Sequence, residues 1–163
     1  MMLDTNDRLP DLALETPDGG TLRLHDMIGE NLVLFFYPKD DTSGCTTEAQ
    51  DFSRLKAAFQ MESTQILGIS KGTSKGKAKF IEKAGLTVAL ATDADDSVCD
   101  AFGTWVEKSM YGRKYMGIDR ATFLIDHDGR IAQVWRKVKV PGHAEAVLEA
   151  ARALKVVRGP NAG

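Results

Sequence analysis

The apolar segment from Leu32 to Tyr37 constrains the fold more than any other part of this sequence. It shows no alternation of apolar and polar residues, which is typical of a strand that is covered on both faces. Pro38 ends the strand, and the polar turn from Lys39 to Gly44 leads into a predicted helix from about Cys45 to Gln60. Because such a strand needs a layer of other elements on each side, the segment predicts a layered α/β fold.

Apolar periodicity and turn residues predict the other elements. The expected strands are residues 11–16 and 21–24 around the turn Pro17-Asp-Gly-Gly20, then 64–70, 86–91, 121–125 and 131–135, and the expected helices are 74–84, 95–102 and 143–154. We interpret residues 103–119 as a long ordered surface loop and residues 158–163 as a loose tail. This order predicts a thioredoxin-like fold in one domain over residues 1–163, with an N-terminal β-hairpin and a central mixed sheet flanked by helices.

Charge and composition exclude several classes of function. The 163 residues carry a net charge of −2, from 21 basic and 23 acidic side chains, so nothing favours nucleic acid or an anionic membrane surface as a partner. The N-terminus lacks the basic and apolar regions of a secretory signal, and no apolar run approaches the length of a membrane span. With only two cysteines, a reducing cytoplasm is the expected compartment.

Cys45 is the residue with the strongest chemical context. It lies where a buried strand passes through a tight turn into a helix, and a helix start supplies unpaired backbone N–H groups and a positive dipole end. Both stabilise a thiolate, which is the reactive form of cysteine. Gly44 allows close backbone approach to a small oxygen ligand, and the hydroxyl of Thr42 can reach the same pocket. On these residues alone, Cys45 is either a nucleophile or a small buried residue at a helix start.

Two motifs resolve that choice through a resemblance. Pro38-x-x-x-Thr42-x-x-Cys45 is similar to the active-site signature of the peroxiredoxins, and Phe36-Tyr-Pro-Lys-Asp-Asp-Thr-Ser-Gly-Cys-Thr-Thr-Glu-Ala49 resembles the PrxQ subfamily, also called bacterioferritin comigratory protein. A second block, Gly117-Ile-Asp-Arg-Ala-Thr-Phe-Leu-Ile-Asp126, resembles the strand that carries the active-site arginine of that family. The similarity runs from about Leu9 to the final helix.

The resemblance implies a thiol-dependent peroxidase that reduces hydrogen peroxide or small organic hydroperoxides without a cofactor. Cys45 would be the peroxidatic thiolate, oxidised to a sulfenic acid by the peroxide. Thr42 and the backbone N–H groups of Gly44 and Cys45 would hold the peroxide oxygens, and Pro38 would shield the sulfur. Arg120 would favour the thiolate and stabilise the charge that develops as the O–O bond breaks.

The role of Glu48, one turn into the helix, stays open. It would either orient the arginine or be an ordinary solvated glutamate.

The sequence departs from many relatives at Gln50, the position that often carries the resolving cysteine. The only other cysteine is Cys99, which is either a resolving thiol or a residue of the core. We favour the core interpretation, because Cys99 shares the apolar side of a short helix with Val98 and Phe102. The expected reductant is then external: thioredoxin, glutaredoxin or a low-molecular-weight thiol. The resemblance also suggests a monomer.

Other interpretations of the function and of possible binding sites have less support. A peroxide sensor oxidised at Cys45 without efficient turnover is the main alternative. The lysines at positions 71, 75, 77, 79 and 83 fit a solvated helix face better than a phosphate loop, and no pair among His25, His127 and His143 has metal-ligand spacing. Trp105, Tyr111, Tyr115 and Met116 either line the mouth of the site or hold the long loop to the body.

Overall fold

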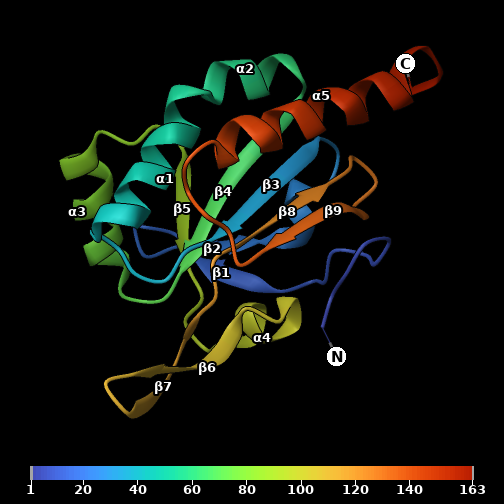
Figure 1. Ribbon diagram of the computed structural model, residues 1–163. Helices are drawn as coiled ribbons and strands as arrows, with labels where there is room; N and C mark the ends of the chain where they lie inside the picture. The colour runs from blue at the N-terminus through green and yellow to red at the C-terminus, as the bar shows by residue number, and fades with distance from the viewer. Residues whose placement is uncertain (1, 163) are drawn as a thin grey trace.

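The computed structural model describes the backbone of residues 2–162 and the side chains of residues 2–154. At its centre is a seven-stranded mixed sheet in the order β2-β1-β5-β4-β3-β8-β9 (Figure 1). Its strands are β1 (Ala13–Glu15), β2 (Thr21–Arg23), β3 (Asn31–Phe36), β4 (Thr64–Ser70), β5 (Ala89–Thr92), β8 (Ala121–Ile125) and β9 (Ile131–Arg136). Strands β3, β4 and β5 are parallel, whereas β8 is antiparallel to β3.

Helices cover both faces of this sheet, as predicted. They are η1 (Leu24–Met27), α1 (Ser43–Arg54), α2 (Lys56–Met61), α3 (Ser74–Ala84), α4 (Ser97–Phe102) and α5 (His143–Ala162). Helices α1, α2, α3 and α5 contribute to the apolar cluster on one face, while α4 and η1 contribute to the cluster on the other (Figure 1). The expected α/β architecture is therefore confirmed.

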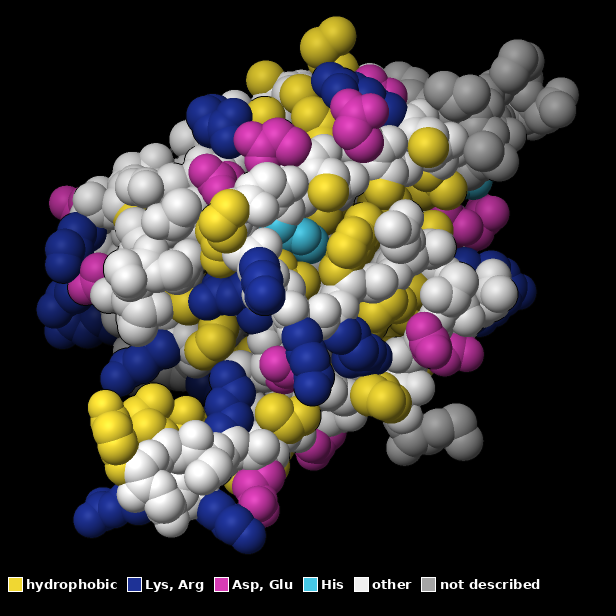
Figure 2. All heavy atoms as spheres, viewed as in Figure 1, with side chains coloured by type: hydrophobic (Ala, Val, Ile, Leu, Met, Phe, Trp, Pro, Cys, Tyr) yellow, Lys and Arg dark blue, Asp and Glu magenta, His cyan; other side chains and the backbone are white. Residues whose placement is uncertain are grey.

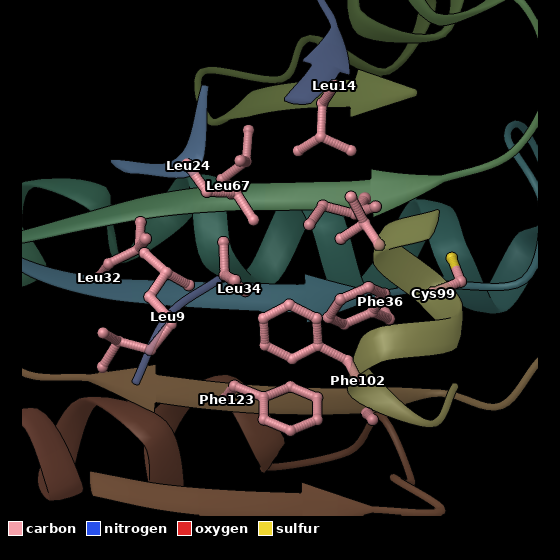
Figure 3. Close-up of a cluster of buried hydrophobic side chains, with 14 of the residues drawn as sticks. Leu9, Leu14, Leu24, Leu32, Leu34, Phe36, Leu67, Cys99, Phe102 and Phe123 are labelled. Atoms are coloured by element: carbon pink, nitrogen blue, oxygen red, sulfur yellow. The ribbon is translucent and has the colours of Figure 1, made fainter. Parts of the chain in front are cut away.

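The buried strand β3 divides the core into these two clusters. Because side chains alternate along a strand, Leu34 and Phe36 point into the cluster under α4, and Val33 and Phe35 point into the cluster under α1. All four side chains are fully buried. Figure 3 shows the first cluster, in which Phe36 packs against Phe102 of α4 at a centroid distance of 5.2 Å. The prediction of a strand covered on both faces is confirmed.

The helix predicted from Cys45 to Gln60 is two helices. The first begins earlier, at Ser43, and ends at Arg54, and the second starts at Lys56. Leu55 between them has φ −95° and ψ 3°, which is not helical. The break leaves Leu55 half-buried, while Phe52 and Phe59 on either side are fully buried and lie 6.0 Å apart between ring centroids.

The prediction of a long loop over residues 103–119 is wrong, because most of this segment is a two-stranded hairpin. Strands β6 (Trp105–Met110) and β7 (Arg113–Ile118) pair in antiparallel register and form a separate sheet beside α4 (Figure 1). Tyr111 and Gly112 form the two-residue turn with φ of 52° and 77°. Positive φ at both positions is typical of a type I′ turn. The dipeptide Asn-Gly predicts such a turn in a sequence, whereas Tyr-Gly does not.

Among the other boundaries, two differ most from the prediction. Strand β5 starts at Ala89 rather than at 86, because the N–H of Leu86 donates to Ile81 O at 3.0 Å and completes the C-terminal cap of α3 around Gly85. Helix α5 continues to Ala162, beyond the predicted end at 154. Gly163 and the side chains from residue 155 onward lie outside the described residues, so the loose tail stays a prediction. Among residues 2–162, no helix combines the length and apolar character needed to cross a membrane.

Candidate active site

Cys45 lies in the first turn of α1, just beyond the carboxyl end of β3. Its side chain is buried, with 1% of the residue exposed, and it belongs to the cluster that contains Tyr37 and Phe52. The first turn of a helix leaves backbone N–H groups without intrahelical acceptors, so the surroundings of the sulfur are rich in donors. The local geometry expected for a reactive cysteine is present.

Arg120 reaches this sulfur from a strand that is far away in sequence. It precedes Ala121, which pairs with Phe36 at the end of β3, so strand pairing places the arginine beside the start of α1. Its Nη2 donates to Cys45 Sγ at 3.4 Å, and its Nη1 donates to Glu48 Oε1 at 2.5 Å. The structure therefore brings together the cysteine, the arginine and the glutamate that the sequence analysis singled out.

Glu48 is not solvated, so that alternative is wrong. It faces the same side of α1 as Cys45 and is only 1% exposed. Its Oε1 is paired with Arg120, but Oε2 is buried with no hydrogen-bond partner among the described residues. Burial raises the pKa of Glu48 to about 7, against the lowering effect of Arg120. The contact geometry fits the interpretation in which Glu48 orients the arginine.

His143 is a neighbour of the site that the sequence did not reveal. Its Nε2 lies 2.7 Å from Thr122 Oγ1, and its ring packs edge-on against Phe52 and Trp135. Burial and the charge of Arg120 lower the pKa of His143 to about 4, so the imidazole is neutral near pH 7. It adds no second positive charge beside Arg120.

The turn before α1 supplies the remaining predicted site residues. Thr42 is the N-cap residue of α1, but its hydroxyl donates to Lys39 O at 3.1 Å and makes no capping bond. A Cβ at Gly44 would lie 3.5 Å from Arg120 Nη2, so the glycine faces the guanidinium. Pro38 and Thr42 both line a cavity of about 740 Å³ beside the turn.

The β6–β7 hairpin forms the opposite wall of this cavity. Trp105, Met110, Tyr115 and Met116 line it, whereas Tyr111 at the tip of the hairpin is 98% exposed. Figure 2 shows hydrophobic side chains gathered on the hairpin, with basic side chains around them. Of the four residues singled out in the sequence, Trp105, Tyr115 and Met116 line this cavity and Tyr111 does not.

Cys99 lies on the other face of the sheet from Cys45. It belongs to the cluster under α4 and has no exposed surface (Figure 3). Its backbone N–H donates to Asp93 Oδ2 at 2.8 Å, and burial together with the Asp93 carboxylate raises the pKa of its thiol strongly. This position favours the core interpretation over a resolving role.

The prediction of a solvated helix face is wrong for two of the five lysines, because Lys71 precedes α3 and is half-buried beside Asp96, and Lys77 is buried. Lys75, Lys79 and Lys83 are exposed, but the side chain of Lys77 has no exposed surface. Its Nζ lies 3.2 Å from Asp40 Oδ2, in the turn that leads to Cys45. The signal was present in the sequence, because Lys77 precedes the buried Phe80 by three residues and so shares its helix face.

Among the described residues, no group of three or more His, Cys, Asp or Glu side chains is arranged to hold a metal ion.

Comparison with known proteins agrees with this fold and site. The model of the AhpC/TSA family matches residues 5–134. Peroxiredoxin Bcp of Xanthomonas campestris is 45% identical over 88% of this chain and 89% of its own length, and peroxiredoxin Bcp of Bacillus subtilis is 43% identical over 91% and 95%. A solved structure of the Xanthomonas campestris bacterioferritin comigratory protein, described for its alkyl peroxide reduction activity, superposes with a TM-score of 0.85 at 43% identity, covering 92% and 98% of the two chains.

A thioredoxin-like fold with a cysteine at a helix start and an arginine on its sulfur defines the class of peroxiredoxins. The chain belongs to the AhpC/TSA family, and the relatives that it matches are the Bcp and PrxQ peroxiredoxins. The resemblance inferred from the two sequence motifs is confirmed.

Proposed function

We propose that this protein reduces hydrogen peroxide and small organic hydroperoxides with Cys45 as its peroxidatic residue. The observation that carries the proposal is the guanidinium of Arg120, which contacts the sulfur of Cys45 and the buried carboxylate of Glu48 at once. Burial by itself acts to lower the pKa of Arg120, but the charges of Glu48 and Cys45 raise it. A permanently charged donor is thus held at the reacting sulfur.

The reaction is a displacement at oxygen. The thiolate of Cys45 attacks one peroxide oxygen, the O–O bond breaks, and water or an alcohol leaves after it takes up a proton, so that Cys45 becomes a sulfenic acid. Negative charge grows on the leaving oxygen, where Arg120 and the backbone N–H groups of Gly44 and Cys45 stabilise it. Thr42 would hold the peroxide from the cavity side, and Pro38 would keep bulk water from the sulfur.

An external thiol would complete the cycle. Cys99 lies across the sheet, and Gln50 occupies the position where many relatives carry the resolving cysteine. The first external thiol would form a mixed disulfide with Cys45 and release water, and a second thiol would then release reduced Cys45. Thioredoxin, glutaredoxin and low-molecular-weight thiols all fit this chemistry. We place the protein in a reducing cytoplasm as a monomeric single domain.

The first prediction concerns the two cysteines. Cys45→Ser should abolish peroxide consumption in excess dithiothreitol, because a hydroxyl is a far weaker nucleophile than a thiolate. Cys99→Ser should retain turnover, since Cys99 lies in the other cluster. Peroxide loss is followed over many equivalents per protein. A wild-type protein that stops after about one equivalent would be a sensor rather than an enzyme.

Mass analysis then identifies the resolving step. After one equivalent of peroxide, an intact mass increased by one oxygen, or by a sulfenic acid trap, supports external resolution. A monomer that has lost two hydrogens would show a Cys45–Cys99 disulfide and overturn that part of the proposal.

A further inference from the structure

Lys77 is a fully buried cation whose partners all belong to segments next to the active site. Its Nζ donates to Asp40 Oδ2 at 3.2 Å and to the backbone oxygen of Lys71 at 2.5 Å. The same ammonium lies 6.0 Å from the centre of the Tyr37 ring, within the range of a cation–π contact. An unpaired charge at such a position would be very costly, so these contacts are required for Lys77 to be there.

Asp40 is the centre of this buried network. Its Oδ1 accepts hydrogen bonds from the Tyr37 hydroxyl at 2.6 Å and from Ser70 Oγ at 3.2 Å, while Oδ2 faces Lys77. Tyr37 follows β3, Ser70 ends β4, and Lys77 lies on α3. One carboxylate therefore connects the active-site turn to Tyr37, just after β3, and to two separate elements, β4 and α3.

The turn before α1 needs these contacts to keep its conformation. Asp41, the residue after Asp40, has φ 61°, in the left-handed region that a side chain other than glycine adopts at a cost. Thr42 follows directly and starts α1 with Cys45 in its first turn. Because Asp40 lies between Pro38 and Thr42, a shift of Asp40 moves both of these residues and the helix start.

From this geometry, and resting on the function proposed above, we propose that Lys77 is a positioning residue for the peroxide reaction. Through Asp40 it holds residues 38–42 in the conformation that presents Thr42 and Cys45 to Arg120. Burial lowers the pKa of Lys77, while the carboxylate of Asp40 raises it and favours the charged form. Buried ion pairs contribute little net stability compared with apolar pairs, so the benefit of this pair is positional.

The test compares Lys77→Met with Lys79→Met, an exposed lysine on the same helix. Two quantities are measured: kcat/KM for hydrogen peroxide, and the hydrogen exchange of peptides from residues 38–46 and from α4. For Lys77→Met we expect kcat/KM to fall about ten- to hundredfold, since small misplacements near a reacting group have effects of that size. Exchange should rise at residues 38–46 and stay unchanged in α4, and Lys79→Met should behave as wild type.

Asp40→Asn breaks the same contact from the side of the turn and serves if Lys77→Met does not fold. The double variant should lose no more activity than either single variant, because both remove one interaction. Unchanged kcat/KM in the single variants would overturn the proposal. Exchange that rises equally in α4 would also overturn it, because Lys77 would then have only a general stabilising role. An inactive wild-type protein would instead refute the proposed function.

Discussion

At Arg120, two buried ionisable neighbours respond to acid in opposite ways. Burial raises the pKa of Glu48 to about 7, so Glu48 takes up its proton more readily in the folded protein than in the unfolded chain. The pKa of His143 is lowered to about 4 by burial and by Arg120, so the folded protein resists protonation there. Between about pH 4.5 and 6.5, the two residues therefore affect the pH dependence of stability with opposite sign.

The Glu48→Gln variant separates these effects. Between pH 4.5 and 7 the folded state binds more protons at Glu48 than the unfolded state does, so this residue makes stability fall as pH rises, by roughly 3 kcal/mol over the range. The variant removes this contribution. Relative to wild type, its free energy of unfolding should therefore increase from pH 5 to pH 7.5, as measured by urea denaturation. A constant difference between the two proteins would contradict the raised pKa.

His143 serves as the control for that experiment. It remains in both proteins, so its contribution cancels in the difference. In Glu48→Gln alone, His143 should make stability rise with pH from about 4 to 6.5, because over that range the unfolded histidine holds a proton that the folded one has lost. The rate of peroxide reduction by Glu48→Gln shows whether the action of Arg120 at Cys45 requires the Glu48 carboxylate.

At the scale of elements, the β6–β7 hairpin forms one wall of the cavity beside the turn that leads to Cys45. It is a separate two-stranded sheet whose Trp105, Met110, Tyr115 and Met116 face the turn before α1 across a cavity. A volume of about 740 Å³ with an apolar wall is more space than hydrogen peroxide needs and suits a compact organic group. The hairpin is therefore expected to affect the choice of peroxide.

The hairpin prediction uses Met116→Ser, which removes apolar surface from that wall. KM for cumene hydroperoxide should rise about threefold to tenfold, because the loss of a few buried methylene groups is worth about 1 kcal/mol or more. The constants for hydrogen peroxide should not change. The exposed Tyr111→Ser at the hairpin tip is the matched control. Equal losses for both peroxides would show that Met116 instead supports the site itself.

At the scale of the whole molecule, the sheet keeps the two cysteines apart. Cys45 lies on α1 and Cys99 lies on α4, with the central strands between them. A disulfide requires Cα atoms about 4.4–6.8 Å apart, so a bond between them would require large rearrangement of the core. The architecture thus explains why a chain with two cysteines is expected to depend on a thiol from outside.

The tight packing of that sheet gives a stability prediction at Gly68 in β4. A Cβ there would lie 2.5 Å from Phe35 Cζ and 2.6 Å from Leu90 Cδ2. Gly68→Ala should therefore reduce the free energy of unfolding by about 1–3 kcal/mol through overpacking, as measured by urea denaturation. Gly117→Ala on the hairpin is the comparison, because its nearest neighbour is a flexible lysine carbon at 3.3 Å. Equal effects at the two positions would contradict this account.

The sequence alone was sufficient for the local features of this protein. The apolar run of β3, the helix over residues 74–84 and the motif from Pro38 to Cys45 each depend on neighbouring residues, and the sequence predicts each of them. The second motif block also identified Arg120, although its distance from Cys45 was not predictable from periodicity. Local propensity and spacing carry this kind of information.

The features that depend on contacts between distant segments were determined only by the tertiary structure. It buried Lys77 against Asp40, paired Glu48 with Arg120 and separated Cys99 from Cys45. The spacing of Lys77 from Phe80 indicates a buried helix face, but the sequence does not show the partner that makes burial of the charge tolerable, because that partner is far away in the chain. Strand pairing and helix packing bring such partners together. The neighbours of the Cys45 sulfur are therefore determined by the whole fold.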